Sequence, residues 1–264
     1  MVSDAVMSSN AVTPPSSASE SRLAVVIPMF NEERGAARCV LEVCKVLVRS
    51  VPSSRLFVVN DGSRDTTQQI LEGLVSAELP FTVVSYQINR GYGAALLEGA
   101  KAARADGFDF GLFMDSDLTN DPALIPMFEK AVQEPIDVVK ASRYIPTGGM
   151  LGVPWFRQII SKTGNRVASL LFNVGIRDCT NGFRAVRLSL LENVTFQERG
   201  FPSIVEELYL LKRAGARFAE VPYVLTARTD DQAGSQFRYN FQTFYRYFKY
   251  CVLAALVMRK HTAR

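Results

Sequence analysis

Residues 108–117 read FDFGLFMDSD, an apolar run that ends directly in the carboxylates of Asp115 and Asp117. A short apolar run of this kind predicts a buried strand. Ligands of open α/β sheets bind at the carboxyl ends of the strands. Because Mg²⁺ prefers carboxylate and phosphate oxygens, this pair can hold a divalent cation beside a pyrophosphate. The triplet alone is a weak signal, since most such triplets are solvated turns or helix caps.

The chain on both sides of this run alternates between apolar runs and helical periodicity. The pattern predicts strands at residues 23–28, 55–60, 81–86, 108–114 and 136–141. Helices are expected at residues 32–48, 65–77, 91–105 and 122–132. Such alternation predicts an α/β fold with a mostly parallel sheet and flanking helices. Beyond residue 141 the regularity weakens, and the pattern indicates helices at 155–173 and 204–214 and a strand at 217–221.

Two further strand ends carry polar residues that we expect at the same edge of the sheet. Phe30-Asn31-Glu32 follows the first strand, and Asn60-Asp61-Gly62 follows the second. Each places polar groups where a nucleotide base or ribose would lie, although an N-cap at Asn31 and a glycine turn are the structural alternatives. The loop NRGYG at 89–93 lacks the P-loop pattern, and the first turn lacks G-x-G-x-x-G. These absences argue against a Walker-type NTPase and a Rossmann dehydrogenase.

The composition of the chain limits the number of domains and the kinds of catalytic site that it can form. A length of 264 residues with 48% hydrophobic content fits one large domain. The single histidine, His261, lies near the C-terminus, which excludes a Ser-His-Asp triad or His-ligated zinc in the folded body. Acid–base or metal chemistry must therefore use carboxylates. The four cysteines lack zinc or redox spacing, which indicates free thiols in a reducing compartment. Residues 1–21 are rich in Ser, Ala and Pro, which predicts a disordered tail. They lack the basic start and apolar run of a secretory signal.

Positive charge is concentrated in two stretches that contain no acidic residue, 140–177 and 232–264. Such stretches indicate anionic partners, namely phosphates, anionic lipid headgroups or nucleic acid. In the second stretch, Phe237–Met258 interleaves eight aromatic residues with Arg and Lys. Its uninterrupted apolar run is shorter than the roughly 20 residues of a membrane span. We expect residues 236–264 to form an amphipathic helix, either at a membrane interface or packed on its own domain, with lipid favoured over nucleic acid.

Seven motifs follow one another along the chain: VVIPMFNEE (25–33), VVNDGSRDTT (58–67), NRGYGAAL (89–96), MDSDLTNDP (114–122), ASRYIPTGG (141–149), RDCTNGFRAVR (177–187) and AEVPYVLTAR (219–228). With these motifs the sequence resembles the family-2 glycosyltransferases of GT-A fold, and more narrowly the dolichol- or polyprenol-phosphate mannose synthases. The resemblance implies a Rossmann-like nucleotide-diphosphosugar transferase domain at residues 22–235.

The resemblance also implies residue roles. Donor nucleotide contacts fall on Pro28, Phe30, Asn31, Glu32, Asn60, Asp61, Asp115, Ser116 and Arg228. Asp115 and Asp117 match a pair that binds Mg²⁺ or Mn²⁺. The acceptor phosphate would meet Arg143, Arg157 and Ser161, and Ser235 lies in a loop that closes over the site. The residues expected to take part in catalysis are Asp117, Arg143 and Arg228.

The residues expected to bind the acceptor phosphate support that role independently of the resemblance. Arg157 and Ser161 are one helical turn apart, in the same acid-free stretch as Arg143. A phosphate clamp is favoured over a solvated basic face, because no carboxylate nearby in sequence could pair with the two arginines. The sequence departs from the family pattern in four places. Asn60 stands where many relatives carry aspartate, and Thr119 replaces a glutamine that can assist the metal. The closing loop TDDQAGSQF is longer than usual and has Gln236 in place of a lysine, and SIVEEL at 203–208 replaces a phenylalanine-glutamine pattern.

The function that the resemblance implies is transfer of a hexose, with inversion, onto a polyprenyl or dolichyl monophosphate. Mannose from GDP-mannose is the expected donor, and a polyprenyl-phosphate glucosyltransferase or another family-2 enzyme using a UDP-sugar is the alternative. A non-catalytic lipid-binding GT-A domain is a further hypothesis, against which the intact acidic and basic residues argue. We expect a peripheral protein on the cytoplasmic face of a membrane, and a homo-oligomer is compatible with the sequence.

Overall fold

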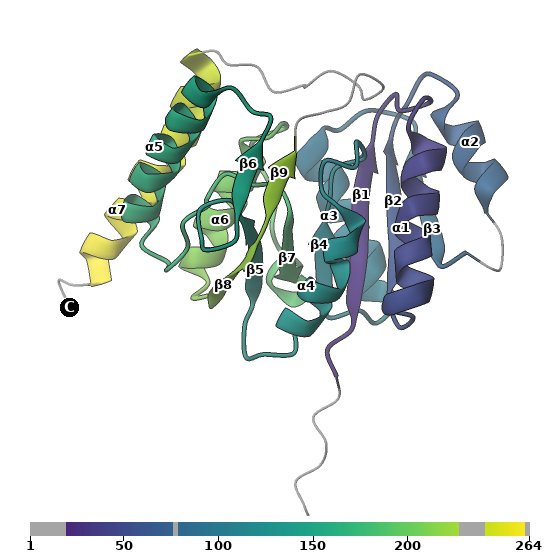
Figure 1. Ribbon diagram of the computed structural model, residues 1–264, viewed down its shortest axis with the longest axis horizontal. Coiled ribbons are helices and arrows are strands. Elements are labelled where there is room, and N and C mark those ends of the chain that lie inside the picture. The colour runs from purple at the N-terminus through teal and green to yellow at the C-terminus, as the bar shows by residue number, and fades with distance from the viewer. Residues whose placement is uncertain (1–19, 76–78, 227–240, 262–264) are drawn as a thin grey trace, which may run out of the picture.

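The computed structural model describes residues 20–75, 79–226 and 241–261, and these form a central sheet with helices on both faces (Figure 1). Seven strands are ordered β3-β2-β1-β4-β7-β5-β8. Their bounds are β1 Leu23–Met29, β2 Arg55–Asp61, β3 Phe81–Tyr86, β4 Phe110–Phe113, β5 Val138–Ser142, β7 Arg184–Arg187 and β8 Phe218–Pro222. Every neighbouring pair runs parallel except the two that involve β7. The predicted mostly parallel α/β sheet is confirmed.

The helices follow the predicted order with shifted ends. They are α1 Ala36–Ser50, α2 Thr67–Leu74, α3 Tyr92–Ala105, α4 Ile125–Ala131, α5 Trp155–Phe172, α6 Ser203–Arg213 and α7 Phe241–His261, with short 3₁₀ turns η1 Pro122–Leu124 and η2 Leu188–Leu190. Helix α1 begins later than expected because the Glu32 carbonyl accepts from the amides of Gly35 and Ala36, which closes a turn first. The N-cap alternative for Asn31 is therefore wrong, since Gly35 occupies that position.

Three strands were not predicted. Strand β7 is antiparallel between β4 and β5, and its sequence RAVR begins and ends with arginine. The strand was missed because its first residue, Arg184, is a buried charge, whereas buried strands are predicted from apolar runs. Strands β6 Gly149–Leu151 and β9 Val224–Thr226 form a separate two-stranded sheet, and each is only three residues long.

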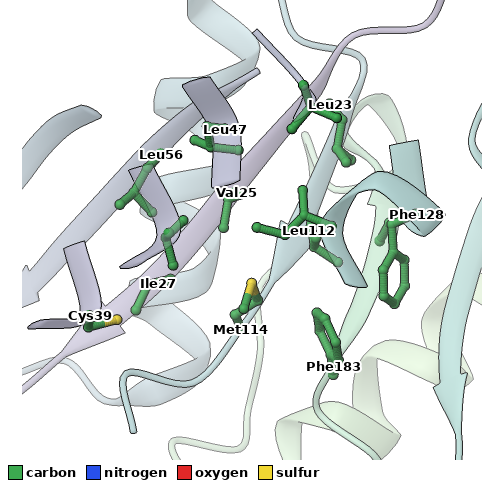
Figure 2. Packing of buried hydrophobic residues seen from close by; sticks show 14 of the residues in the cluster. Leu23, Val25, Ile27, Cys39, Leu47, Leu56, Leu112, Met114, Phe128 and Phe183 are labelled. Atoms are coloured by element: carbon green, nitrogen blue, oxygen red, sulfur yellow. The ribbon is translucent and has the colours of Figure 1, made fainter. Parts of the chain in front are cut away.

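Successive side chains of β1 point to opposite faces of the sheet, so they contribute to two hydrophobic cores, one on each face. Val25 and Ile27 pack with α1 on one face, where Figure 2 shows them among Leu47, Leu56 and Leu112. Ala24 and Val26 point to the opposite face, which α3 covers. A Cβ at Gly99 of α3 would lie 2.4 Å from Cγ1 of Val26, so glycine is needed for this helix to approach the sheet.

Helix α7 lies beside α5 at the end of the molecule far from α2 (Figure 1). It packs against α5 and α6, and its Tyr250, Cys251 and Ala254 are buried in a third core. Glu198 holds the same helix through ion pairs with Arg246 and Lys249. One side of the helix therefore packs on its own domain, while Tyr245, Phe248 and Leu256 of the same helix are exposed. Within the described residues, no helix is long and apolar enough to cross a membrane.

Candidate active site

The three strand ends singled out in the sequence meet at one edge of the sheet. Strand β1 pairs in parallel with β2 on one side and with β4 on the other. The segments that follow these strands therefore leave the sheet next to one another, with residues 30–32 in the middle. The expected convergence of the three strand ends is confirmed, and it follows from parallel pairing alone.

The acidic turn, which is Asp115-Ser116-Asp117 after β4, is held by hydrogen bonds within its own loop. One further bond comes from Tyr223, which lies between β8 and β9. The amide of Asp115 donates to Oδ1 of Asn120 at 2.9 Å. The amide and hydroxyl of Thr119 both donate to Oδ1 of Asp117, at 3.0 and 2.6 Å. Leu118 between them is left-handed, with φ of 56°, and Tyr223 donates to the carbonyl of Thr119 at 2.6 Å. Thr119 thus orients Asp117, while Asp115, Ser116 and Asp117 stay partly exposed.

The chemistry of this turn fits a hard divalent cation. Carboxylate oxygens are the ligands that Mg²⁺ and Mn²⁺ prefer, and Mg²⁺ sites use one or two carboxylates together with substrate phosphates. Among the described residues, no group of three or more His, Cys, Asp or Glu side chains could hold an ion. Asp115 and Asp117 would leave most positions around such an ion to other oxygens, such as those of water or of a bound diphosphate.

Asp61 and Asn60 are buried, with polar atoms used inside the protein. The carboxylate of Asp61 accepts from the amides of Arg90 and Gly91, at 2.7 and 2.9 Å, and so anchors the NRGYG loop. The amide side chain of Asn60 donates to Gln68 at 2.6 Å, and its oxygen accepts from the amide of Ser63. These bonds give both residues a role in shaping the loops around the site, beside any contact with a nucleotide.

The loop after β1 is tied to the loop after β2. Asn31 is left-handed, with φ of 56°, and its side chain accepts from the amide of Arg64 at 2.8 Å. The amide of Glu32 donates to Thr67 at 2.8 Å. Pro28, Phe30 and Glu32 are partly exposed at this edge, whereas Asn31 is exposed. The sequence-predicted donor residues are thus brought together, except Arg228, which lies outside the described residues together with Ser235.

A cavity of about 500 Å³ joins the acidic turn to the sequence-predicted acceptor residues. Asp115, Arg143, Arg157 and Ser161 all line it, together with Thr180. The rest of its wall comes chiefly from apolar side chains of α5, α6, α7 and β9: Ile160, Val167, Ala168, Ile204, Val205, Leu225, Phe244, Phe248 and Cys251. The cavity is therefore lined by both charged or polar groups and a large apolar surface.

Arg143 is paired with a carboxylate, contrary to the reasoning from the sequence. Its Nε and Nη2 donate to the two oxygens of Asp178 at 2.7 and 2.8 Å, and Nη2 also reaches Thr180. Asp178 is fully buried and lies 35 residues away, so proximity in sequence could not reveal it. Burial alone would lower the pKa of Arg143, but the charge and hydrogen bonds of Asp178 outweigh that effect and raise it. The pair fixes the guanidinium at the cavity wall.

Ser161 and Arg157 lie on the neighbouring helix. The hydroxyl of Ser161 is 2.7 Å from the hydroxyl of Tyr144, so a ligand here would meet two hydroxyl groups. Arg157 is exposed, and its guanidinium lies 5.9 Å from the ring of Phe156. Tyr144 and Asp178 are site residues that the sequence analysis missed. Both belong to motifs quoted for the resemblance, which was their only signal.

The sheet and the acidic turn define a glycosyltransferase of GT-A fold. The family model for Glycosyl transferase family 2 matches residues 24–195, and the chain belongs to this family. The chain is 30% identical over 211 residues to a polyprenol monophosphomannose synthase of Mycolicibacterium smegmatis, covering 78% of each chain. It is 28% identical to a dolichol-phosphate mannosyltransferase of Pyrococcus furiosus, covering 78% of this chain and 57% of that one. An undecaprenyl-phosphate mannosyltransferase of Micrococcus luteus is 27% identical, with 78% and 84% covered.

Solved structures agree on the fold. Glucosyl-3-phosphoglycerate synthase from Mycobacterium tuberculosis, in complex with phosphoglyceric acid, gives a TM-score of 0.62 at 20% identity, over 89% of this chain and 80% of that chain. Its complex with Mn²⁺, UDP and glucosyl-3-phosphoglycerate gives 0.59 at 23% identity, over 90% and 80%. At this identity the likeness establishes the GT-A architecture alone.

Proposed function

We propose that the protein transfers mannose from GDP-mannose to a polyprenyl or dolichyl monophosphate, with inversion at the anomeric carbon. The observation that carries this proposal is the mixed lining of the cavity. Arg143, Ser161 and Asp115 contribute charged and polar groups, while apolar side chains of α5, α6 and α7 make up much of the remaining wall. A small polar acceptor would gain nothing from the apolar walls, whereas a phosphate joined to a hydrocarbon chain matches both kinds of lining. The names of the three relatives support the same acceptor class and the same sugar.

The reaction needs little acid–base help. An oxygen of the acceptor phosphate forms the bond to the anomeric carbon, as the bond from that carbon to the donor diphosphate breaks. The leaving diphosphate takes the electron pair, and no proton needs to be removed because the acceptor phosphate is already ionised near neutral pH. Positioning by Arg143, Arg157 and Ser161 brings the attacking oxygen to the donor.

Asp115 and Asp117 are proposed to hold Mg²⁺ or Mn²⁺, and Arg228 is proposed to contact the donor diphosphate. When bound, a divalent ion offsets the negative charge that develops on the leaving diphosphate. The solved neighbours that contain Mn²⁺ or Mg²⁺ together with UDP support this use of the metal. The alternative donor, a UDP-sugar, remains an outcome of the test below.

Product formation with two donors and two acceptors tests the proposal. GDP-mannose and UDP-glucose are each incubated with a polyprenyl monophosphate in detergent and with phosphoglyceric acid, in the presence of Mn²⁺ or Mg²⁺. We expect a mannosyl lipid phosphate from the first donor and the lipid acceptor, at a rate at least about a hundredfold above the other combinations. Transfer to phosphoglyceric acid would overturn the acceptor assignment, and preference for UDP-glucose would overturn the donor.

We also propose that the protein is peripheral on a membrane surface and binds it through α5 and α7. Exposed apolar side chains gather on these two adjacent helices: Trp155, Phe156, Ile159, Ile160, Val167 and Leu170 on α5, and Phe244, Tyr245, Phe248, Val252 and Leu256 on α7. Basic residues stand among them, and residues 140–177 contain no acid. This composition suits an anionic lipid surface. Ile160, Phe244 and Phe248 of these two helices also line the cavity, which supports entry of a lipid acceptor from this surface.

Vesicle flotation is expected to show binding to vesicles with phosphatidylglycerol and weaker binding to phosphatidylcholine alone. Trp155 and Leu170 are each 73% exposed and do not line the cavity. The double variant Trp155→Ser with Leu170→Ser should lower vesicle affinity at least about tenfold, because each large side chain gains roughly 1.5–3 kcal/mol on leaving water. The matched control changes Leu41 and Val48, exposed on α1, to serine. Equal loss in both double variants, or none in the first, would contradict the assignment.

A further inference from the structure

We propose that Tyr92 is a positioning residue for the metal-binding carboxylate of Asp115, an inference that rests on the metal site of the proposed function. The hydroxyl of Tyr92 donates to Oδ1 of Asp115 at 3.3 Å. The two residues are 23 positions apart, and Tyr92 begins α3 whereas Asp115 follows β4. The contact therefore joins two elements of the fold at the acidic turn.

The phenol is fixed from several sides. Its ring packs on the ring of Phe201, with centroids 5.2 Å apart. A Cβ built on Gly182 would lie 3.4 Å from the Tyr92 hydroxyl and 3.9 Å from Oδ2 of Asp115, so the backbone of that loop passes close to both groups.

The backbone of the Gly182 loop is itself anchored in the core. Nη1 of Arg184 donates to the carbonyl of Gly182 at 2.7 Å. The same guanidinium is paired with Glu207 of α6, and both side chains are almost fully buried. The guanidinium also lies 4.9 Å from the ring of Phe113, at the end of β4. The loop beside Tyr92 and Asp115 is thus held by a buried ion pair and its hydrogen bonds.

Hydrogen bonding of one carboxylate oxygen restricts the rotation of the whole group. Tyr92 binds Oδ1 of Asp115 from α3, while Oδ2 of the same carboxylate lies near the Gly182 loop. Groups that hydrogen-bond to a metal ligand commonly change metal affinity by about 10–100-fold when they are removed, because they orient that ligand. The sequence gives no sign of this role, since Tyr92 occurs in a glycine-rich loop.

The test is the affinity of the full-length protein for Mn²⁺ with saturating GDP or UDP, followed by the electron paramagnetic resonance signal of the free ion. Tyr92→Phe removes only the hydroxyl and is expected to weaken Mn²⁺ binding about tenfold. The affinity for the nucleotide without metal, and the unfolding temperature, should stay as in the wild type. A residue with a merely structural role would alter these two quantities as well.

The matched control is Tyr209→Phe, since the hydroxyl of Tyr209 makes no hydrogen bond within the described part of the chain. It should bind Mn²⁺ as the wild type does. If Tyr92→Phe also keeps the wild-type affinity, the inference fails while the metal site stands. If the wild type itself binds no Mn²⁺ with either nucleotide, the metal site and the inference fail together. A tenfold loss confirms the role of Tyr92 whichever sugar or acceptor the enzyme uses.

Discussion

Replacing Asp117 by asparagine is expected to lower turnover by about a thousandfold or more, with the fold intact. The change keeps an oxygen that can accept from the amide and hydroxyl of Thr119, so the turn after β4 retains its hydrogen bonds. It removes the negative charge that the proposed cation needs. Turnover is measured as mannosyl transfer at saturating donor, and the fold by circular dichroism and the unfolding temperature.

Two comparisons sharpen the result. Asp117→Ala should be at least as inactive, and it also loses the contacts to Thr119. Asp106→Ala changes an exposed carboxylate at the end of α3, and it should leave turnover unchanged. Full activity of the Asp117→Asn variant would contradict the assignment of Asp117 to the metal site. Loss of activity in all three variants would point instead to a general sensitivity to charge.

The largest expected effect on stability belongs to Glu207→Ala, which should lower the free energy of unfolding by about 3–5 kcal/mol. Arg184 and Glu207 are 1% and 2% exposed, and their side chains are joined by two hydrogen bonds, one of them 2.6 Å between Nη2 and Oε2. Removing the carboxylate leaves a guanidinium in the core without its counter-charge. The loss would be a large part of the roughly 5–15 kcal/mol that stabilises a typical domain.

Equilibrium unfolding in urea measures this loss. Glu192→Ala is the matched control, because Glu192 pairs with Arg104 at 3.0 Å while both side chains remain about half exposed. Surface pairs of this kind contribute at most about 1 kcal/mol. A cost below about 1 kcal/mol for Glu207→Ala would show that water or a rearranged partner satisfies Arg184, and the buried pair could not then be the anchor of the Gly182 loop.

The strand–helix order could be predicted because it depends on local periodicity. Residues 23–28 and 108–114 are mostly apolar runs of strand length, and their alternation with helical periodicity favours a parallel sheet. Parallel pairing then brings the loops after β1, β2 and β4 to one edge. The position of the acidic turn followed from these local facts, whereas β7 was missed because its first residue is a buried arginine.

Ion-pair and hydrogen-bond partners that are distant in the sequence could not be predicted from local patterns. Arg143 was predicted to be unpaired because the stretch around it contains no acid, yet Asp178 meets it from 35 residues away. Asp61 and Asn60 were predicted to contact a nucleotide, and their polar atoms are used to hold neighbouring loops. A linear pattern gives the types of charge that a segment carries, but the fold determines which charges meet.

The sequence by itself thus determined the class of fold, the edge of the sheet that carries the acidic turn, and the family, because these depend on periodicity and on motifs read in order. Only the tertiary structure decided how the carboxylates are held. Tyr92 reaches Asp115 from the start of helix α3, and Asp178 fixes Arg143 from a separate loop. Helix α7 supplies Phe244, Tyr247 and Phe248 to the cavity wall. The physical reason is that hydrogen bonds and ion pairs act over a few ångströms in space, and distance along the chain does not record them.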